Sequence, residues 1–255
     1  MKNYRKVAIE AALESGVFIK RSVGKISSVS YKGRDNIVTN VDKTSEKMIV
    51  KKILSNFPGH SILGEEGNSL ESGSSYRWVI DPLDGTTNFA HAFPFFCVSI
   101  ALEKDGESIL GVVYDPMRRE LFVAERGRGA SLDGKLITVS GINKLGGAFL
   151  ATGFSYGITR KDRNITHFKK LLVKTLAIRR AGSAALDLCY VACGRFDGYW
   201  EMSLHPWDIA AGTLMVKEAK GIVTKFDGKP CTNYDRSILA TNGLIHKQMI
   251  SSLRK

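Results

Sequence analysis

The stretch Asp81-Pro-Leu-Asp84-Gly-Thr-Thr-Asn88 is the part of the sequence that best predicts the fold and the chemistry of this protein. It places two carboxylates three residues apart, directly after residues 76–80, whose aromatic and β-branched side chains predict a strand. Gly85 and the threonines that follow predict the start of a helix, where backbone N–H groups favour an anion. Paired Asp oxygens favour Mg²⁺. A strand that ends in carboxylates and turns into a helix can therefore hold hard cations and a phosphate at one point.

The composition is that of an ordinary globular protein, long enough for one large domain or two halves that share a cleft. Of its 255 residues, 44% are hydrophobic and 24% are charged. No apolar run approaches the ~20 residues that cross a bilayer. A charge interrupts the apolar residues 7–12, which predicts an amphipathic helix and not a signal peptide. Because the four cysteines show neither metal-ligand nor disulfide spacing, we expect a cytoplasmic protein without membrane contact.

The formal net charge of +12 at pH 7 has two interpretations. A basic protein can steer anionic substrates toward its site, or it can bind nucleic acid or a transcription complex. No compact block of Lys and Arg interleaved with aromatic residues stands out, which favours a solvated basic surface over a dedicated RNA or DNA site.

The order of predicted elements indicates a layered α+β protein. Strands cluster late in the first half and are joined by short turns, which favours antiparallel pairing, whereas helices and strands alternate after residue 146. Helices are predicted at residues 4–23, 43–57, 163–174, 183–193, 208–219 and 243–253. Strands are predicted at residues 36–41, 60–63, 76–80, 96–103, 109–115, 120–125, 148–152, 175–179, 196–201, 222–226 and 237–240, and loops at 31–35 and 68–75.

Carboxylates occur at three further ends of predicted elements. Glu65 and Glu66 follow a short strand, and Asp42 and Asp208 each open a helix. Taken singly, the two aspartates could be ordinary N-caps and the glutamate pair a solvated turn. Taken jointly with Asp81 and Asp84, they predict an acidic site built from several segments.

Together these motifs resemble the inositol monophosphatase family of Mg²⁺-dependent, lithium-sensitive phosphatases. The first signature of the family is present as Trp78-Val-Ile-Asp-Pro-Leu-Asp-Gly-Thr-Thr-Asn-Phe89. The second is present as Trp207-Asp-Ile-Ala-Ala-Gly212, followed by Glu218-Ala-Lys-Gly221. Shorter landmarks are Gly64-Glu-Glu66, Val38-Thr-Asn-Val-Asp42 and Gly182-Ser-Ala-Ala185. The resemblance covers essentially the whole chain and departs at Lys220, where the family commonly has Gly.

The resemblance implies a layered α-β-α-β-α sugar-phosphatase architecture in two parts. Residues 1–145 would form an N-terminal α+β half with most of the metal ligands. Residues 146–255 would form a C-terminal α/β half with the substrate contacts and Asp208. The family also implies a homodimer.

A site for two to three Mg²⁺ ions is implied by the same resemblance. Glu65, Asp81 and the backbone carbonyl of Leu83 would hold the first ion. Asp81, Asp84 and Asp208 would hold the second, and Glu65 with water a weaker third. Few carboxylates per ion suffice because Mg²⁺ keeps several waters, and two ions can clamp the attacking and leaving oxygens of an in-line displacement.

Catalysis in the family uses activated water, without a covalent phospho-enzyme. Gly85 and Thr86 would give backbone N–H groups to the phosphate, since glycine lets the backbone come close. Thr86 with Glu65 would orient and deprotonate the water, and Asp42 would support Thr86. We expect His91 and His205, which lie near the two signatures, to be structural.

The alcohol part of the substrate should meet the second half of the chain. By resemblance Glu201 would contact hydroxyls, Arg180 would lie near the substrate, and Gly182 and Ala184 would line the pocket wall; Asp84 and Asp208 would also reach the substrate. A surface or dimer-interface ion pair is an alternative for Arg180. A solvated strand end is the alternative for Glu201.

The function that follows is Mg²⁺-dependent hydrolysis of a phosphate monoester, with myo-inositol 1-phosphate favoured because Glu201 suits a polyol. Relatives that share the metal centre act on fructose 1,6-bisphosphate, on nucleotide phosphates such as NADP, or on histidinol phosphate. Some bacterial members also join RNA-polymerase antitermination complexes, so a scaffold with residual phosphatase activity is the alternative from a different class.

Overall fold

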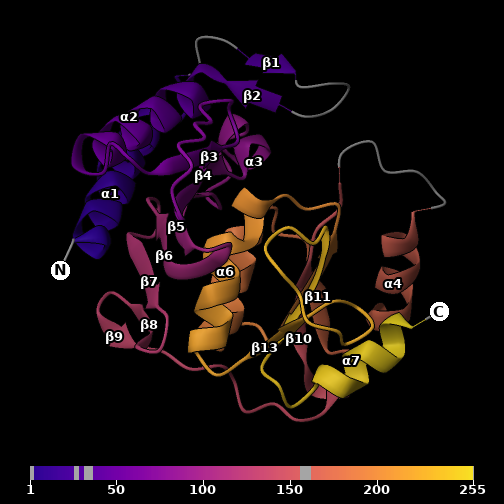
Figure 1. The fold of residues 1–255 in the computed structure, drawn as a ribbon. Helices are drawn as coiled ribbons and strands as arrows, with labels where there is room; N and C mark the ends of the chain where they lie inside the picture. The colour runs from indigo at the N-terminus through magenta and orange to yellow at the C-terminus, as the bar shows by residue number, and fades with distance from the viewer. Residues whose placement is uncertain (1–2, 26–28, 32–36, 156–161, 255) are drawn as a thin grey trace.

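The computed structural model describes residues 3–25, 29–31, 37–155 and 162–254, which stack in alternating layers of helices and sheets (Figure 1). Helices α1 (Tyr4–Ser22) and α2 (Asn40–Asn56) form one outer layer, and α4 (Arg163–Leu172) and α7 (His246–Leu253) form the other. Helices α5 (Ala184–Ala192) and α6 (Pro206–Glu218) lie between the two main sheets. The predicted α-β-α-β-α architecture is confirmed.

The first sheet has seven strands in the described residues, in the order β3-β4-β5-β6-β7-β8-β9. The parallel pair β3–β4 stands at one edge, and the remaining neighbours are antiparallel, as the short turns predicted. The strands are β3 (Ser61–Gly64), β4 (Tyr76–Asp84), β5 (Cys97–Lys104), β6 (Glu107–Asp115), β7 (Glu120–Glu125), β8 (Gly129–Leu132) and β9 (Lys135–Leu136).

The second sheet mixes parallel and antiparallel pairs in the order β11-β10-β12-β14-β13. Its strands are β10 (Phe149–Thr152), β11 (Ala177–Arg179), β12 (Gly198–Met202), β13 (Ile222–Thr224) and β14 (Ser237–Thr241). A separate antiparallel ribbon pairs β1 (Val29–Tyr31) with β2 (Ile37–Thr39). The loop predicted at 31–35 therefore begins one residue too early, because Tyr31 is in β1, and the rest of that loop lies outside the described residues, as does Asn36.

Several predicted boundaries were wrong, for local reasons. Strands β8 and β9 were not predicted, because they have only four and two residues, too few for an alternating pattern to show. Helix α2 does not open at Asp42, since Thr39 is its N-cap and Asp42 is the third helical residue of a capping box. Asp208 occupies the same position in α6, after His205 and Pro206. Lys220, beyond the end of α6, adopts φ +71°, a left-handed conformation that glycine adopts without strain.

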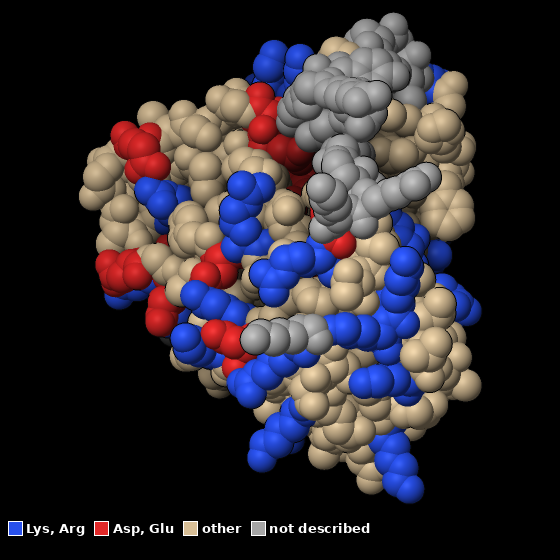
Figure 2. Space-filling view, turned by 90° about the vertical axis from the view of Figure 1, so that its right-hand side faces the viewer, with Lys and Arg blue, Asp and Glu red and all other residues tan. Residues whose placement is uncertain are grey.

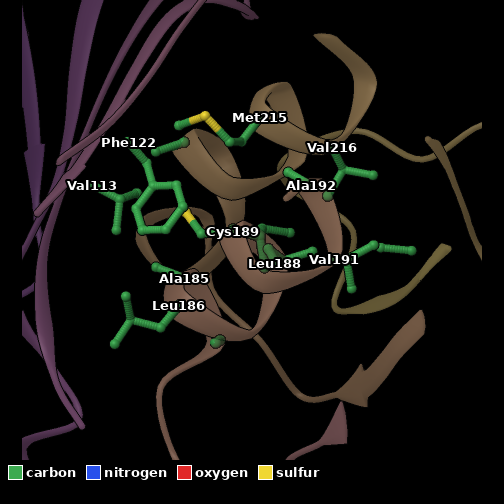
Figure 3. Packing of buried hydrophobic residues seen from close by; sticks show 14 of the residues in the cluster. Val113, Phe122, Ala185, Leu186, Leu188, Cys189, Val191, Ala192, Met215 and Val216 are labelled. Atoms are coloured by element: carbon green, nitrogen blue, oxygen red, sulfur yellow. The ribbon is translucent and has the colours of Figure 1, made fainter. Parts of the chain in front are cut away.

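The central helices are packed against the first sheet by an apolar cluster (Figure 3). Val113 and Phe122 of the sheet face Leu188 and Cys189 of α5 and Met215 of α6, and all five side chains are fully buried. Burial of this kind contributes roughly 1.5–3 kcal/mol for each large side chain. Because α5 and α6 are held against the sheet, their N-terminal ends have fixed positions relative to the end of β4.

A close approach between β6 and α6 sets how near Asp208 can come to the sheet. A Cβ atom on Gly111 would lie 2.8 Å from the carbonyl oxygen of Ala211. Only a residue without a side chain fits there. Among the described residues, no helix is long and apolar enough to cross a membrane.

We predict that Gly111→Ala lowers the free energy of unfolding by about 1–3 kcal/mol, because the added methyl group forces the sheet and α6 apart. Urea denaturation measures the change. Gly141→Ala is the matched control, since a Cβ atom there meets nothing within 4 Å. Equal stability of the two variants would contradict the packing argument.

Candidate active site

A cleft of about 610 Å³ opens where the end of β4 meets the N-terminal ends of α5 and α6. Every site residue predicted from the sequence lines it except Asp42, which contacts it through Thr86. The predicted residues that line the cleft are Glu65, Asp81, Leu83, Asp84, Gly85, Thr86, Arg180, Gly182, Ala184, Glu201 and Asp208. Residues from both halves of the chain therefore share one cavity.

A bulge in β4 brings Asp81 and Asp84 to the same cavity. Asp81 pairs with Ser99 of β5 and Asp84 pairs with Cys97, so β4 contains one residue more than its partner strand over this interval. In a regular strand, residues three apart point to opposite faces. The extra residue re-aims Asp84, and the backbone N–H of Leu83 donates to Asp81 Oδ1 at 3.0 Å. The sequence predicted that the strand ends before Asp81, whereas both aspartates belong to it.

Asp84 is held by the N-terminus of α5. Its Oδ2 accepts from the Ser183 hydroxyl at 2.6 Å and from the Ala185 backbone N–H at 2.7 Å. Ser183 is also the N-cap of this helix. Since the positive end of the helix dipole faces the carboxylate, this contact ties the first sheet to the second half of the chain at the cleft.

The loop that carries Glu65 is held by a buried carboxylate that the sequence did not reveal. Glu46 of α2 is fully buried and accepts from the backbone N–H groups of Glu66 at 2.8 Å and Asn68 at 3.0 Å. A Cβ atom on Gly64 would lie 2.5 Å from Glu46 Oε2. In the sequence, Glu46 is one charge among several on a helix, and only its tertiary contacts distinguish it.

Asp42 and Thr86 form the predicted pair. Thr86 Oγ1 donates to Asp42 Oδ1 at 2.8 Å, and the hydroxyl and backbone N–H of Thr39 donate to Asp42 Oδ2 at 2.5 Å and 2.9 Å. Asp42 is 1% exposed. Burial raises the pKa of its carboxyl, and the Thr39 and Thr86 hydrogen bonds act against that rise. The Thr86 hydroxyl is also 3.0 Å from the Leu83 carbonyl oxygen, which is a second acceptor for it.

Gly85 makes the sharp turn between β4 and α3 (Thr86–Ala90). It adopts φ +97°, and a Cβ atom there would lie 3.0 Å from the carbonyl oxygen of Phe95. Both facts require glycine at this position.

The cleft carboxylates raise one another's pKa values. Burial raises the pKa of Asp81 well above its usual range, and Glu65, Asp84 and Asp208 raise it further. Asp208 is affected in the same way, with the His205 N–H at 2.7 Å acting against the rise. Burial also raises the pKa of Asp84 to about 6, against the hydrogen bonds from Ser183 and Ala185. Carboxylates buried together need positive charge to stay ionised.

The donor set fits a hard cation that brings its own waters. Within the described residues, no group of three or more His, Cys, Asp or Glu side chains is arranged as a metal site by itself. Mg²⁺ does not require such a group, because it is bound through one or two carboxylates, keeps several waters, and prefers oxygen ligands. The carboxylates of Asp81, Asp84 and Asp208 and the Leu83 carbonyl supply oxygen alone.

Glu201 lies in the same cleft, near Arg180. Its Oε2 accepts from the Tyr199 hydroxyl at 2.5 Å, and burial raises the pKa of the Glu201 carboxyl to about 7. A Cβ atom on Gly153 would lie 2.0 Å from the same oxygen, so glycine there makes room for this carboxyl. Arg180 donates to the Phe154 carbonyl at 3.3 Å, lines the cleft, and lowers the pKa of Glu201.

The two histidines that were expected to be structural lie in different places. His91 is exposed and does not line the cleft. His205 does line it, stacks on Trp207 with ring centroids 4.9 Å apart, and precedes α6 as its N-cap. Cleft residues that the sequence did not reveal include Gly153, Asp187 and Arg236.

Comparison with known proteins gives one consistent result. The Inositol monophosphatase family matches residues 1–255. The Nus factor SuhB of Pseudomonas aeruginosa is 43% identical, covering 100% of this chain and 97% of its own. The inositol-1-monophosphatase of Synechocystis sp. is also 43% identical, covering 99% and 89%. The crystal structure of the extragenic suppressor protein suhB from Bartonella henselae superposes with a TM-score of 0.94 at 39% identity over 98% of each chain.

We predict that Mg²⁺ raises the melting temperature more at pH 7 than at pH 5. A carboxyl whose pKa is higher in the folded than in the unfolded chain binds more protons when folded, so its contribution to stability falls as pH rises. For Asp84 the fall spans from about 4 to about 6. A cation relieves the repulsion that remains above this range, whereas protons compete with it below.

Thermal melts of chelator-treated protein, with and without Mg²⁺, measure this difference at each pH. The buried histidines His167 and His246 titrate equally in both arms and cancel. Asp84→Asn should shrink the difference. A Mg²⁺-induced shift that is equal at pH 5 and pH 7 would contradict the assignment of these carboxylates to a cation site.

Proposed function

The chain belongs to the inositol monophosphatase family, and from that premise we propose that it is a Mg²⁺-dependent phosphatase acting on inositol 1-phosphate or a closely similar polyol phosphate. One observation carries the proposal. A single cleft combines the carboxylates of Asp81, Asp84 and Asp208 with the Gly85-Thr86 turn, and Glu201 lines the same cleft. A cation site beside an anion-binding turn suits a phosphate ester, and a further carboxyl suits the hydroxyls of its alcohol.

The residues around the proposed phosphate site have two kinds of role: some bind the cation or the phosphate, and others position the water or take up its proton. Glu65, Asp81, Leu83, Asp84 and Asp208 would hold Mg²⁺, which would supply a lowered pKa of the attacking water and neutralise charge on the phosphate. Thr86 Oγ1 lies within hydrogen-bond distance of Asp42 Oδ1 and of the Leu83 carbonyl oxygen, and its lone pairs can accept a hydrogen bond from that water and orient it. Glu65 accepts the proton as the water attacks. The backbone N–H groups of the Gly85-Thr86 turn bind the phosphate oxygens.

The alcohol end selects the ester. Glu201 accepts hydrogen bonds from substrate hydroxyls, and Tyr199 holds it in place. The positive charge of Arg180 favours the ionised carboxylates of Glu201 and Asp187, and so lowers the pKa values of both. Fructose 1,6-bisphosphate and NADP carry further anionic groups, which the Glu201 carboxylate would repel.

We predict that the protein releases phosphate from inositol 1-phosphate only with Mg²⁺, and that Asp84→Asn lowers kcat by at least about a thousandfold. Removing one carboxylate from a metal-assisted site costs on the order of 4 kcal/mol of transition-state stabilisation. Phosphate release measures it, on a panel that includes fructose 1,6-bisphosphate and NADP, each with and without Li⁺.

The control is Asp227→Asn, which removes an exposed carboxylate whose ion pair is with Lys229. It should retain wild-type activity. Release by the wild type no faster than by Asp84→Asn would remove the proposal.

A transcription scaffold is the second candidate, and the distribution of charge favours it. Residues 146–255 contain seventeen Lys and Arg but eight Asp and Glu, a net charge of +9 out of +12. Four of those acidic residues are turned inward, at Asp187, Asp197, Glu201 and Asp208. Figure 2 shows Lys and Arg gathered over the lower part of the face that carries α4 and α7, where Arg163, Lys169, Lys247 and Arg254 are exposed. Relatives of equal identity are named Nus factors.

We predict that an Asp84→Asn protein still retains transcription factors in a pull-down from its own cell extract, because the basic face is remote from the carboxylate. A variant with Lys169, Lys247 and Arg254 changed to Glu should lose them while keeping phosphatase activity. If neither protein retains a transcription factor, the scaffold function is unsupported.

A further inference from the structure

Asp187 has a buried carboxyl in the cleft, and the proposed mechanism assigns it no role. It lies in the first turn of α5, is 1% exposed and lines the cavity. Within the described residues its Oδ1 has no hydrogen-bond partner. A buried polar atom left unpaired costs about 1–3 kcal/mol, so the group calls for a partner that the described part of the chain does not supply.

Other carboxyls of the site have donors from the chain. Asp84 accepts from Ser183 and Ala185, and Asp208 accepts from the backbone of His205. Glu201 accepts from the Tyr199 hydroxyl. Asp187 therefore differs from its neighbours in lacking a donor, not in being buried.

The groups that face Asp187 come from three elements. Burial raises the pKa of its carboxyl most, Glu201 of β12 and Asp84 of β4 raise it further, and Arg180 ahead of α5 lowers it. Asp187 therefore shares its part of the cleft with Glu201 and Arg180.

We propose that Asp187 is a specificity-determining residue that binds a hydroxyl of the substrate's alcohol part together with Glu201. The inference rests on the proposed phosphatase function and adds a second hydroxyl contact to the same site. A polyol hydroxyl is both a donor and an acceptor, so one hydroxyl can pair with the Asp187 carboxyl while a neighbouring hydroxyl donates to Glu201. An ester without hydroxyls would leave Asp187 Oδ1 without this partner and Glu201 with the Tyr199 hydroxyl alone.

The way in which Glu201 packs against the wall of the cleft supports a joint role for Glu201 and Asp187 in binding hydroxyls. Because Gly153 has no side chain, the Glu201 carboxyl can lie against the backbone there, where Tyr199 holds it. With Glu201 fixed in this way, its carboxyl and that of Asp187 share the cleft with polar side chains that include Arg180, Arg236 and Ser203. A site built to hydrogen-bond a hydroxyl discriminates strongly against a ligand that lacks it.

The test compares two substrates of each variant with Mg²⁺ present. Inositol 1-phosphate carries free hydroxyls, and p-nitrophenyl phosphate carries none. Asp187→Leu, close in size but unable to hydrogen-bond, should lose at least about tenfold in kcat/KM on inositol 1-phosphate, mainly through KM. Its kcat/KM on p-nitrophenyl phosphate should stay within about threefold. Asp187→Asn keeps a donor and should stay near wild type on both substrates.

Two further variants guard against a purely structural explanation. Asp187→Ala removes the carboxyl without adding bulk, and should show the same selective loss if the leucine variant does not fold. Cys189→Ala changes a fully buried side chain of the same helix outside the cleft and should leave the ratio of the two kcat/KM values unchanged.

Equal losses on both substrates, or no loss on inositol 1-phosphate, would overturn the role of Asp187 while leaving the phosphatase function standing. A wild-type protein that hydrolyses p-nitrophenyl phosphate but not inositol 1-phosphate would overturn the polyol substrate itself, and the inference with it. The two failures are therefore distinguishable.

Discussion

The mutual repulsion of buried carboxylates is the constraint on which the rest of this structure depends. Asp81, Asp84 and Asp208 face one cleft, and burial and neighbouring carboxylates raise the pKa values of Asp81 and Asp208. Asp81 is buried and the other two are half-buried, so water screens their repulsion incompletely and the fold must hold their positions. The bulge in β4, the N-terminus of α5 and the backbone ahead of α6 each hold one of them. The α5–α6 layer is therefore as much a part of the site as the signature on β4.

Helix α5 contributes to the cleft at two points. Its N-terminus binds Asp84 through Ser183 and Ala185, and its first turn carries Asp187, whose pKa Glu201 raises. One rigid element therefore fixes both the carboxylate of Asp84 and the buried carboxyl of Asp187.

Much of the fold followed from pattern alone, and the errors share a cause. Periodicity located the helices, and short turns indicated antiparallel strands in the first sheet, because both patterns are local. The misplaced starts of α2 and α6 came from treating Asp42 and Asp208 as caps, whereas each reaches back from the third helical position. Glu46, Gly153 and Asp187 were missed because their partners are distant in sequence: Glu46 is twenty residues from Glu66, and Gly153 faces Glu201.

The sequence by itself determined the family, the order of elements and the identity of the carboxylates on which the proposed cation site rests, because each of these is written in short motifs whose residue types have few chemical uses. Tertiary structure alone decided which of these residues meet. It showed that Asp84 shares a face with Asp81 through a bulge, that Thr86 is bonded to Asp42, and that Asp187 is left without a donor beside Glu201. The physical reason is that burial and hydrogen bonding depend on what lies across the cleft, and neighbours in space are not neighbours in the chain.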